Sequence, residues 1–282
     1  MHGKSTMLSK AASRTTLCFV LAVLVSVIVV LGLAGCDSAK SEAQDAFKAA
    51  STALDEKNAE VDTAIADLQS VMESEIKPLD EAAITSAEEA ISSAQSAKVT
   101  APDMANETDA IKGQTAELEK VDYKAQLDGI AKAKAGLENS IKQRQQVTNP
   151  SEAFVIQRLT GIEHVETPTA VTEGHDPNGR LGKQGGYTAT VYFVSDLVDQ
   201  SKVVGDGVIE KGTDGGGAVE VYPDVSGAEK RNEELAAYDG TIIASGSHTV
   251  CGTCLIRTSD NLSASQQKEL ETAMIEALTR LE

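Results

Sequence analysis

Two cysteines near the C-terminal end of this chain have a spacing that could support redox or metal chemistry. The stretch HTVCGTCLIR, from His248 to Arg257, places Cys251 and Cys254 three apart, with a histidine three residues before the first. A thioredoxin-type pair requires a helix N-terminus, where the helix dipole lowers the thiol pKa, but the residues after Cys254 are strand-like. Zinc would need another ligand and usually a second spaced pair. The stretch therefore favours a structural disulfide or two buried thiols.

The backbone at Gly252 decides between those two states. One continuous strand advances about 3.3 Å per residue and would hold the Cα atoms about 10 Å apart, beyond the roughly 7 Å that a disulfide bridges. Gly252 and Thr253 could instead be the central residues of a type II′ hairpin turn, which would bring the cysteines together. The β-branched flanks favour one long strand with two free thiols. The hairpin with a disulfide between Cys251 and Cys254 is the alternative.

A second group of polar residues lies in the stretch EGHDPNG. Glu173, His175, Asp176 and Asn178 offer oxygen and imidazole ligands on one loop. A calcium loop normally fills alternating positions with acidic or amide oxygens, but Pro177 interrupts this series and only two of the positions are filled. The same residues suit an Asp-Pro-Asn-Gly turn. A turn is therefore favoured, and a metal site is the alternative.

Catalytic chemistry has little support elsewhere in the sequence. The chain has four histidines, one of them in the first 35 residues, and no serine stands in a strand-turn-helix elbow. The glycine-rich stretch TDGGGAVE lacks the helix that a phosphate cradle needs after its glycines. We therefore expect neither catalytic activity nor a cofactor.

The first 35 residues have the layout of a secretory signal. Three basic residues and no acidic one precede an uncharged apolar run over residues 17–35. The run leads into LAGC at 33–36, which resembles the lipobox of bacterial lipoproteins. The resemblance implies cleavage between Gly35 and Cys36, a diacylglyceryl group on the Cys36 thiol, and an acylated N-terminus. An uncleaved transmembrane helix is the alternative, because 19 apolar residues nearly suffice to span a bilayer.

Both interpretations place the rest of the chain on the extracytoplasmic face of a cell membrane. The leader holds three basic residues, so the net charge of residues 36–282 is −18 − 3 = −21. This acidity argues against a nucleic-acid partner, which would select a basic patch. We therefore expect membrane attachment through the lipid anchor, and an envelope or extracellular protein or glycan as partner.

Residues 36–146 have the composition and apolar periodicity of long helices. The stripe of the first helix comprises Phe47, Ala50, Leu54, Val61, Ile65, Leu68, Met72 and Ile76. Pro78 and Pro102 divide the region into three pieces, and the third includes a break near Asp122. We predict an elongated antiparallel three-helix bundle. The pattern is loosely similar to helical modules of Gram-positive wall proteins, including the FIVAR type, which favours a spacer.

Residues 147–282 differ in composition and predict a small α+β domain with a mainly antiparallel sheet whose helices cover one face. Strands are predicted over 187–195 and 218–222. The predicted helix starts have Asn149 with Glu152, Ser226 with Glu229, and Ser263 with Gln266 as capping pairs.

Three stretches of this domain resemble a C-terminal domain of actinobacterial surface lipoproteins that has no assigned biochemical activity. They are AVTEGHDPNGRLGKQGGYTATVYF, GGGAVEVYPDVSGAEKRNEEL and LIRTSDNLSASQQKELE. The resemblance implies a surface location and supplies no catalytic residue. We predict a membrane-anchored lipoprotein that acts as a structural, presenting or interaction protein of the envelope. A small-solute or ion binding protein and an envelope redox protein are the alternatives.

Overall fold

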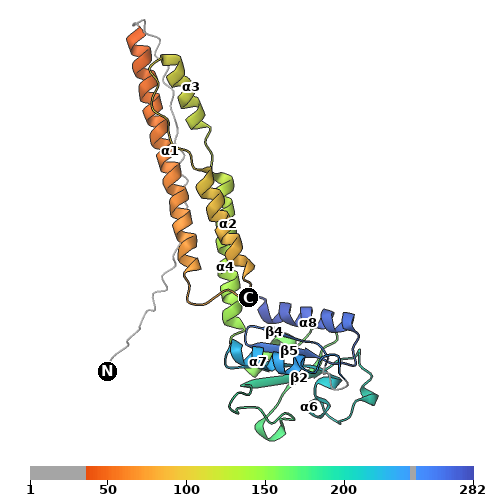
Figure 1. The fold of residues 1–282 in the computed structure, drawn as a ribbon. Helices are drawn as coiled ribbons and strands as arrows, with labels where there is room; N and C mark the ends of the chain where they lie inside the picture. The colour runs from red at the N-terminus through yellow and green to blue at the C-terminus, as the bar shows by residue number, and fades with distance from the viewer. Residues whose placement is uncertain (1–35, 242–245) are drawn as a thin grey trace, which may run out of the picture.

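The computed structural model describes residues 36–241 and 246–282, which form a long helical stalk and an α+β domain (Figure 1). The predicted fold class is therefore confirmed. The lipobox residues Leu33, Ala34 and Gly35 lie outside the described residues, and Cys36 is the first residue of the first helix. Within the described ranges, no helix is both long and apolar enough to cross a membrane.

The stalk is a bundle in which the third helix is broken. Its helices are α1 (Cys36–Met72), α2 (Ala82–Ala97), α3 (Thr108–Glu119) and α4 (Lys124–Gln146). α1 runs toward the α+β domain, α2 returns along it, and α3 and α4 run in the direction of α1 (Figure 1). The predicted three-helix arrangement is thus present, with α3 and α4 as the two parts of the third helix.

The break between α3 and α4 lies at the predicted place, and side chains hold it. Asp122 Oδ1 accepts a hydrogen bond from the backbone N–H of Lys124 at 2.8 Å, at the start of α4. The hydroxyl of the buried Tyr123 donates to Asn58 Oδ1 at 2.9 Å and accepts from the Val99 N–H at 2.8 Å. The break therefore places a tyrosine between α1 and the end of α2.

Only part of the stalk has three helices side by side. α2 ends at Ala97, and the connection over residues 98–107 continues without helix beside α1 and α3. Gln114 holds this connection, because its Nε2 donates to the Asp103 carbonyl and its Oε1 accepts from the Ala105 N–H, both at 2.9 Å. The outer part of the stalk is therefore a helix pair with an extended segment.

The predicted apolar stripe of α1 forms the stalk core. Its members from Phe47 to Leu68 are buried, and Met72 is partly buried against them. The stripe does not extend to Ile76, which is 38% exposed. This part of the prediction is wrong because α1 ends at Met72, so Ile76 no longer follows the helical period.

The α+β domain contains one five-stranded antiparallel sheet. Its strands are β1 (Glu166–Ala170), β2 (Ala189–Val194), β3 (Gly216–Val221), β4 (His248–Cys251) and β5 (Cys254–Thr258). They lie in the order β1-β2-β3-β5-β4, and every neighbouring pair is antiparallel. β2 and β3 match the two strands that the sequence predicts.

Helices cover both faces of this sheet, so the prediction of one covered face is wrong. The helices of the domain are α5 (Glu152–Leu159), α6 (Val208–Lys211), α7 (Val225–Ala236) and α8 (Ala264–Thr279). α5 and α8 pack on the face that carries Val191 and Phe193. α7 packs on the opposite face, where Tyr192 and Leu255 are buried. Alternate residues of the strands are large and apolar on both sides, which requires a cover on each.

Of the three predicted N-terminal helix caps, only the one at α8 matches the structure. There Ser263 and Gln266 form the predicted capping box. α5 instead begins after Ser151, whose side chain accepts from the Phe154 N–H. α7 begins after Asp224, whose carboxylate accepts from the Gly227 N–H at 2.8 Å. The predicted caps at Asn149 and Ser226 are therefore wrong, because a neighbouring side chain reaches the free N–H groups.

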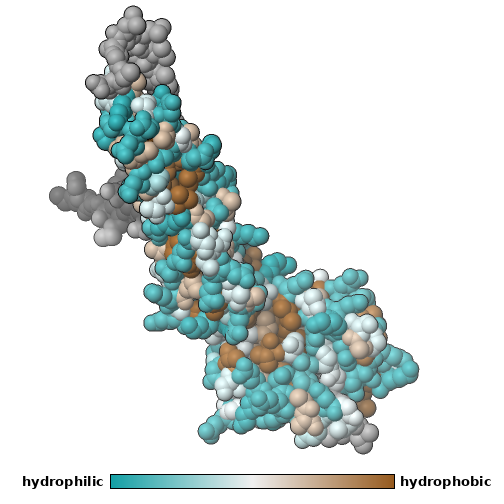
Figure 2. Space-filling view, turned by 45° about the horizontal axis from the view of Figure 1, so that its top comes forward, coloured by the Kyte–Doolittle hydropathy of each residue, from teal (hydrophilic) through white to brown (hydrophobic). Residues whose placement is uncertain are grey.

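The stalk enters the α+β domain without a linker. α4 ends at Gln146, whose Nε2 donates to the carbonyls of Leu278 at 2.6 Å and Arg280 at 3.1 Å. The next residue, Val147, is fully buried in the core of the domain, and Leu79 from the α1–α2 connection packs against the same core. Hydrophobic side chains gather where the two parts meet (Figure 2). The joint is therefore packed as an interior.

Candidate functional site

The loop predicted to offer metal ligands is organised around one carboxylate. Asp176 Oδ2 accepts from the backbone N–H groups of Arg180 at 2.6 Å and Leu181 at 2.8 Å, and Oδ1 accepts from the Asn178 N–H at 3.0 Å. The hydroxyl of the buried Tyr187 also donates to Oδ1. Burial alone would raise the pKa of Asp176, but these four hydrogen bonds outweigh it and lower the pKa. Asp176 therefore anchors the loop.

Of the other three candidate ligands, His175 and Asn178 contact different partners. Glu173 and His175 lie in a short 3-10 turn, and His175 Nε2 is 3.6 Å from Glu210 Oε1. Asn178 Nδ2 donates to the hydroxyl of Tyr192 at 2.9 Å, within the domain. Among the described residues, no group of three or more histidine, cysteine or acidic side chains could hold a metal ion. Asp176 to Gly179 form the turn that the sequence predicts, because the Gly179 N–H donates to the Asp176 carbonyl at 3.1 Å.

The two cysteines lie opposite each other in a hairpin. Cys251 ends β4, Cys254 begins β5, and the two are paired in the sheet register. Gly252, the first turn residue, has φ +64°, as a type II′ turn requires. The prediction of one long strand is therefore wrong, and the hairpin turn of the alternative is present without its disulfide. Both thiols are nevertheless free.

Their surroundings make these thiols unreactive. Both are buried on the face that α5 and α8 cover. Burial raises the pKa of Cys251 to about 11. Burial, and then the neighbouring Cys251, raises the pKa of Cys254 as well. His248 is not directed at them, because its ring nitrogens lie 2.7 Å from Asn232 Oδ1 and 3.3 Å from Asp239 Oδ1. A catalytic thiol needs the opposite shift of pKa.

The hairpin turn contacts the residues that directly follow the end of the stalk. Thr253 N–H donates to the Val147 carbonyl at 2.9 Å, and Thr253 Oγ1 accepts from the Asn149 N–H at 2.7 Å. A Cβ at Gly252 would lie 2.3 Å from Val147 Cγ2 and 2.5 Å from the Val147 carbonyl oxygen. The glycine is therefore required twice, for its positive φ and for the close approach of Val147.

A buried cluster of charges lies between the sheet and α7. Glu220 is fully buried, and its Oε1 accepts from Arg257 Nη1 at 2.8 Å. Its Oε2 accepts from the Tyr222 hydroxyl at 2.8 Å and lies 3.5 Å from Arg231 Nε. Burial and the charge of Glu220 raise the pKa of Tyr222. Each oxygen of this carboxylate thus has a partner, as a buried charge requires.

The same cluster extends to the loop that Asp176 anchors. Glu234 Oε2 accepts from Arg231 Nη1 at 3.2 Å and from Arg180 Nη1 at 3.0 Å. Burial would raise the pKa of Glu234, but the hydrogen bonds from the two arginines outweigh it and lower the pKa. The cluster joins β3, β5, α7 and the loop through charges that satisfy one another. Sequence reasoning missed it.

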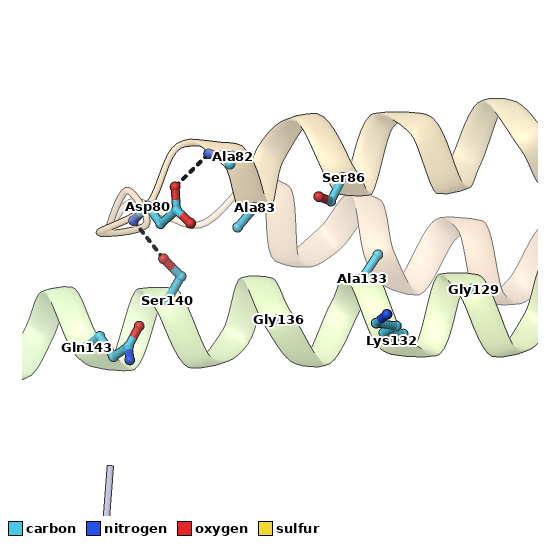
Figure 3. A pocket seen from close by; sticks show the side chains of 10 residues that line it. All are labelled: Asp80, Ala82, Ala83, Ser86, Gly129, Lys132, Ala133, Gly136, Ser140 and Gln143. Atoms are coloured by element: carbon cyan, nitrogen blue, oxygen red, sulfur yellow. Dashed lines mark hydrogen bonds between the residues drawn. The ribbon is translucent and has the colours of Figure 1, made fainter. Parts of the chain in front are cut away.

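A groove of about 460 Å³ runs between α2 and α4 on the stalk. Figure 3 shows Ala83 and Ser86 on α2 across from Ala133 and Gly136 on α4. The polar groups at the Asp80 end of the groove are already hydrogen-bonded within the chain. The Asp80 N–H donates to Ser140 Oγ at 2.9 Å, and Asp80 Oδ1 accepts from the Ala82 N–H at 2.9 Å. The groove therefore offers shape and few free polar groups, unlike a small-molecule site.

Comparisons of the chain with protein-family models, with curated proteins and with solved structures give no match.

Proposed function

We propose that the chain is a membrane-anchored surface lipoprotein whose stalk presents the α+β domain away from the membrane. It acts as a structural, presenting or interaction protein of the cell envelope. The observation that carries this proposal is the course of α1, which starts at Cys36 and runs for 37 residues toward the α+β domain (Figure 1). A helix of that length reaches about 55 Å at 1.5 Å per residue. Lipid on Cys36 would hold the domain at about that distance.

The joint between stalk and domain supports presentation in a fixed orientation. Val147 is buried in the domain core, and Gln146 bonds to two carbonyls at the end of α8. A flexible tether would expose such a connection and leave its hydrogen bonds to water. The packed joint instead transmits the direction of the stalk to the α+β domain.

The alternatives have no specific observation in their favour. An ion or solute binding protein needs convergent polar groups around a cavity, but the carboxylate of Asp176 is occupied by backbone and Tyr187 donors. A redox protein needs an accessible thiol of low pKa, but Cys251 is buried and its pKa is raised. We therefore place the function on the outer surface of the protein.

The charge of that surface limits the partner. The stalk, residues 36–146, has 22 acidic and 12 basic residues, and residues 147–282 have 21 and 10. Both parts are thus strongly acidic, at −10 and −11. Polyanions such as nucleic acid are repelled by such a surface. We propose a neutral or basic protein or glycan of the envelope as the partner.

Fatty-acid labelling tests the anchor. Cells that express the chain should incorporate labelled palmitate into it, and Cys36→Ser should abolish the label and prevent cleavage at Gly35. Cys18→Ser is the matched control, because Cys18 lies inside the apolar run of the leader and should not affect labelling. A mature N-terminus before Cys36 in mass spectrometry would contradict the proposal. An amine reagent that cannot cross the membrane should label lysines of the α+β domain on intact cells, and an unlabelled domain would also contradict the proposal.

A further inference from the structure

The α4 side of the groove between α2 and α4 carries two glycines that no contact within the chain explains. Gly129 and Gly136 lie seven residues apart within α4, and both are exposed at the groove. A Cβ built at either position meets no atom of the described chain within 4 Å. Glycine inside a helix is less favourable than alanine, and no positive φ calls for it here. The missing side chains therefore leave room for something outside the chain.

Charged residues of opposite sign stand at about the same level on the two helices that form the groove. Asp80 bonds to Ser140, and α2 and α4 run in opposite directions with the same rise per residue. Glu89, nine residues further along α2, therefore stands level with about residue 140 − 9 = 131 on α4, next to Lys132. Glu89 follows Ser86, which lines the groove, by about one helical turn of α2, and Lys132 lines the groove on α4.

These two charged side chains have no ionic partner in the described part of the chain. Lys134, two residues beyond Lys132, pairs with Asp67 on α1 at 3.4 Å. Lys98, at the end of α2, pairs with Asp62 at 2.6 Å. Among the described residues, no such ion pair includes Glu89 or Lys132, and both residues are exposed. Both side chains are thus available to a complementary surface.

We propose that this face pairs two copies of the chain side by side with their stalks parallel. A rotation of 180° about an axis along the stalk lays α2 of one copy against α4 of its partner. Each Glu89 then faces the partner's Lys132, so two ion pairs form at the edges of a seam of small residues. A rotation about an axis across the stalk would place α2 on α2, with Glu89 near its own copy. Charge therefore selects the parallel arrangement among the two symmetric ones.

The proposed membrane anchor requires the same arrangement, although the pairing does not depend on it. Parallel stalks keep both copies of Cys36 at one end and both α+β domains at the other. The groove lies on the stalk, so the pairing leaves the sheet and α7 free for another partner. Two presented domains would then stand together on one membrane.

Charge reversal and sedimentation equilibrium of the full chain in detergent test this pairing. The wild type should have twice the mass of one chain. Lys132→Glu and Glu89→Lys should each raise the dissociation constant roughly tenfold or more, because like charges then meet across the seam. The double variant should restore the wild-type value. A single-chain mass for the wild type, or a double variant no better than the single ones, would overturn the proposal.

Two glycine variants separate the groove from general effects on the helices. Gly136→Leu fills the groove and should shift the protein to single chains, while its circular dichroism stays helical. Gly113→Leu is the matched control, because Gly113 is also an exposed glycine inside a helix with no atom within 4 Å of its Cβ, but lies on α3 outside the groove. Equal effects of the two variants would count against the groove.

Spin labels at Lys48, on the outer half of α1, test the direction. The parallel pair predicts one short distance between labels, and a distance near the full length of the stalk would reject the parallel arrangement. Cys36→Ser serves as an independent variant, because it should remove the lipid and leave the pairing intact. Failure of the anchor and failure of the pairing are therefore distinguishable.

Discussion

The substitution Gly252→Ala should weaken the joint between the stalk and the α+β domain. Alanine at φ +64° is disfavoured by about 1–2 kcal/mol. Its Cβ would also lie 2.3 Å from Val147 Cγ2 and 2.5 Å from the Val147 carbonyl oxygen, so Val147 must move. Loss of a buried valine contact contributes about 1.5–3 kcal/mol. We expect the free energy of unfolding to fall by about 3–5 kcal/mol in total.

A control at Gly161 isolates the contact from the backbone strain. Gly161 has φ +87°, and a Cβ there meets no atom within 4 Å, so Gly161→Ala should lose only the strain of about 1–2 kcal/mol. Urea unfolding followed by tyrosine fluorescence measures the α+β domain, because four of the five tyrosines lie after Val147. Hydrogen exchange at the Thr253 N–H, which bonds to the Val147 carbonyl, reports the joint itself. Equal losses in the two variants would refute the proposed role of Val147.

Three further predictions concern the interior of the α+β domain. The lowered pKa of Asp176 means that its carboxylate stabilises the fold above pH about 4 and that this contribution is lost as the pH falls through the folded pKa. Asp176→Asn should therefore lower the Tm at pH 7 and reduce its further fall in acid, and an unchanged acid profile would contradict this. Glu220→Ala should lower the free energy of unfolding by about 3–5 kcal/mol, because it leaves a buried guanidinium unpaired, whereas the exposed Glu229→Ala should change it by less than about 0.5 kcal/mol in the same urea experiment. Iodoacetamide at pH 8 should leave Cys251 and Cys254 unmodified in the folded protein and label both in urea without reductant, and a mass two hydrogens lower would reveal a disulfide instead.

The helices of the stalk could be predicted from the sequence because apolar residues recur along them at helical spacing. Residues such as Leu54, Val61 and Leu68 recur at helical spacing, and all three are buried. The break near Asp122 was also within reach, since an aspartate before a helix start can bond a free N–H, as it does with Lys124. The non-helical connection around Pro102 was predicted as well, because a helix usually ends before a proline. Periodicity did not reveal that this connection packs along α1 and α3, because those contacts join residues far apart in the sequence.

The hairpin could not be predicted with the same means, because a distant residue decides it. The β-branched flanks of Cys251 and Cys254 suit a strand, and Gly252 suits either a strand or a turn. Thr253 bonds to the carbonyl of Val147, 106 residues away in the sequence, and that contact holds the turn. A pattern confined to ten residues does not contain this information.

The buried charges escaped prediction for a related reason. Glu220 alternates with apolar neighbours in AVEVY, which usually indicates a polar side chain facing water on one side of a sheet. α7 covers that side, and Arg257, 37 residues later, supplies the compensating charge. The signal that could have found the pair is an arginine in the strand-like stretch LIRT beside a glutamate in another predicted strand.

Residues 36–282 carry a net charge of −21, so two copies of the chain on one membrane repel each other. Acidic surfaces repel each other, but salt confines that repulsion to a distance of about 8 Å at physiological ionic strength. Any attraction between copies must therefore act at contact, through groups that meet directly. Lys132 at the groove and Glu89 on the facing helix are such groups, whereas Arg231 and Arg257 of the α+β domain already pair with the buried Glu220. Parallel pairing in a membrane also removes much of the rotational freedom that association costs in solution, so a contact that is weak in detergent would be stronger where both lipids are inserted.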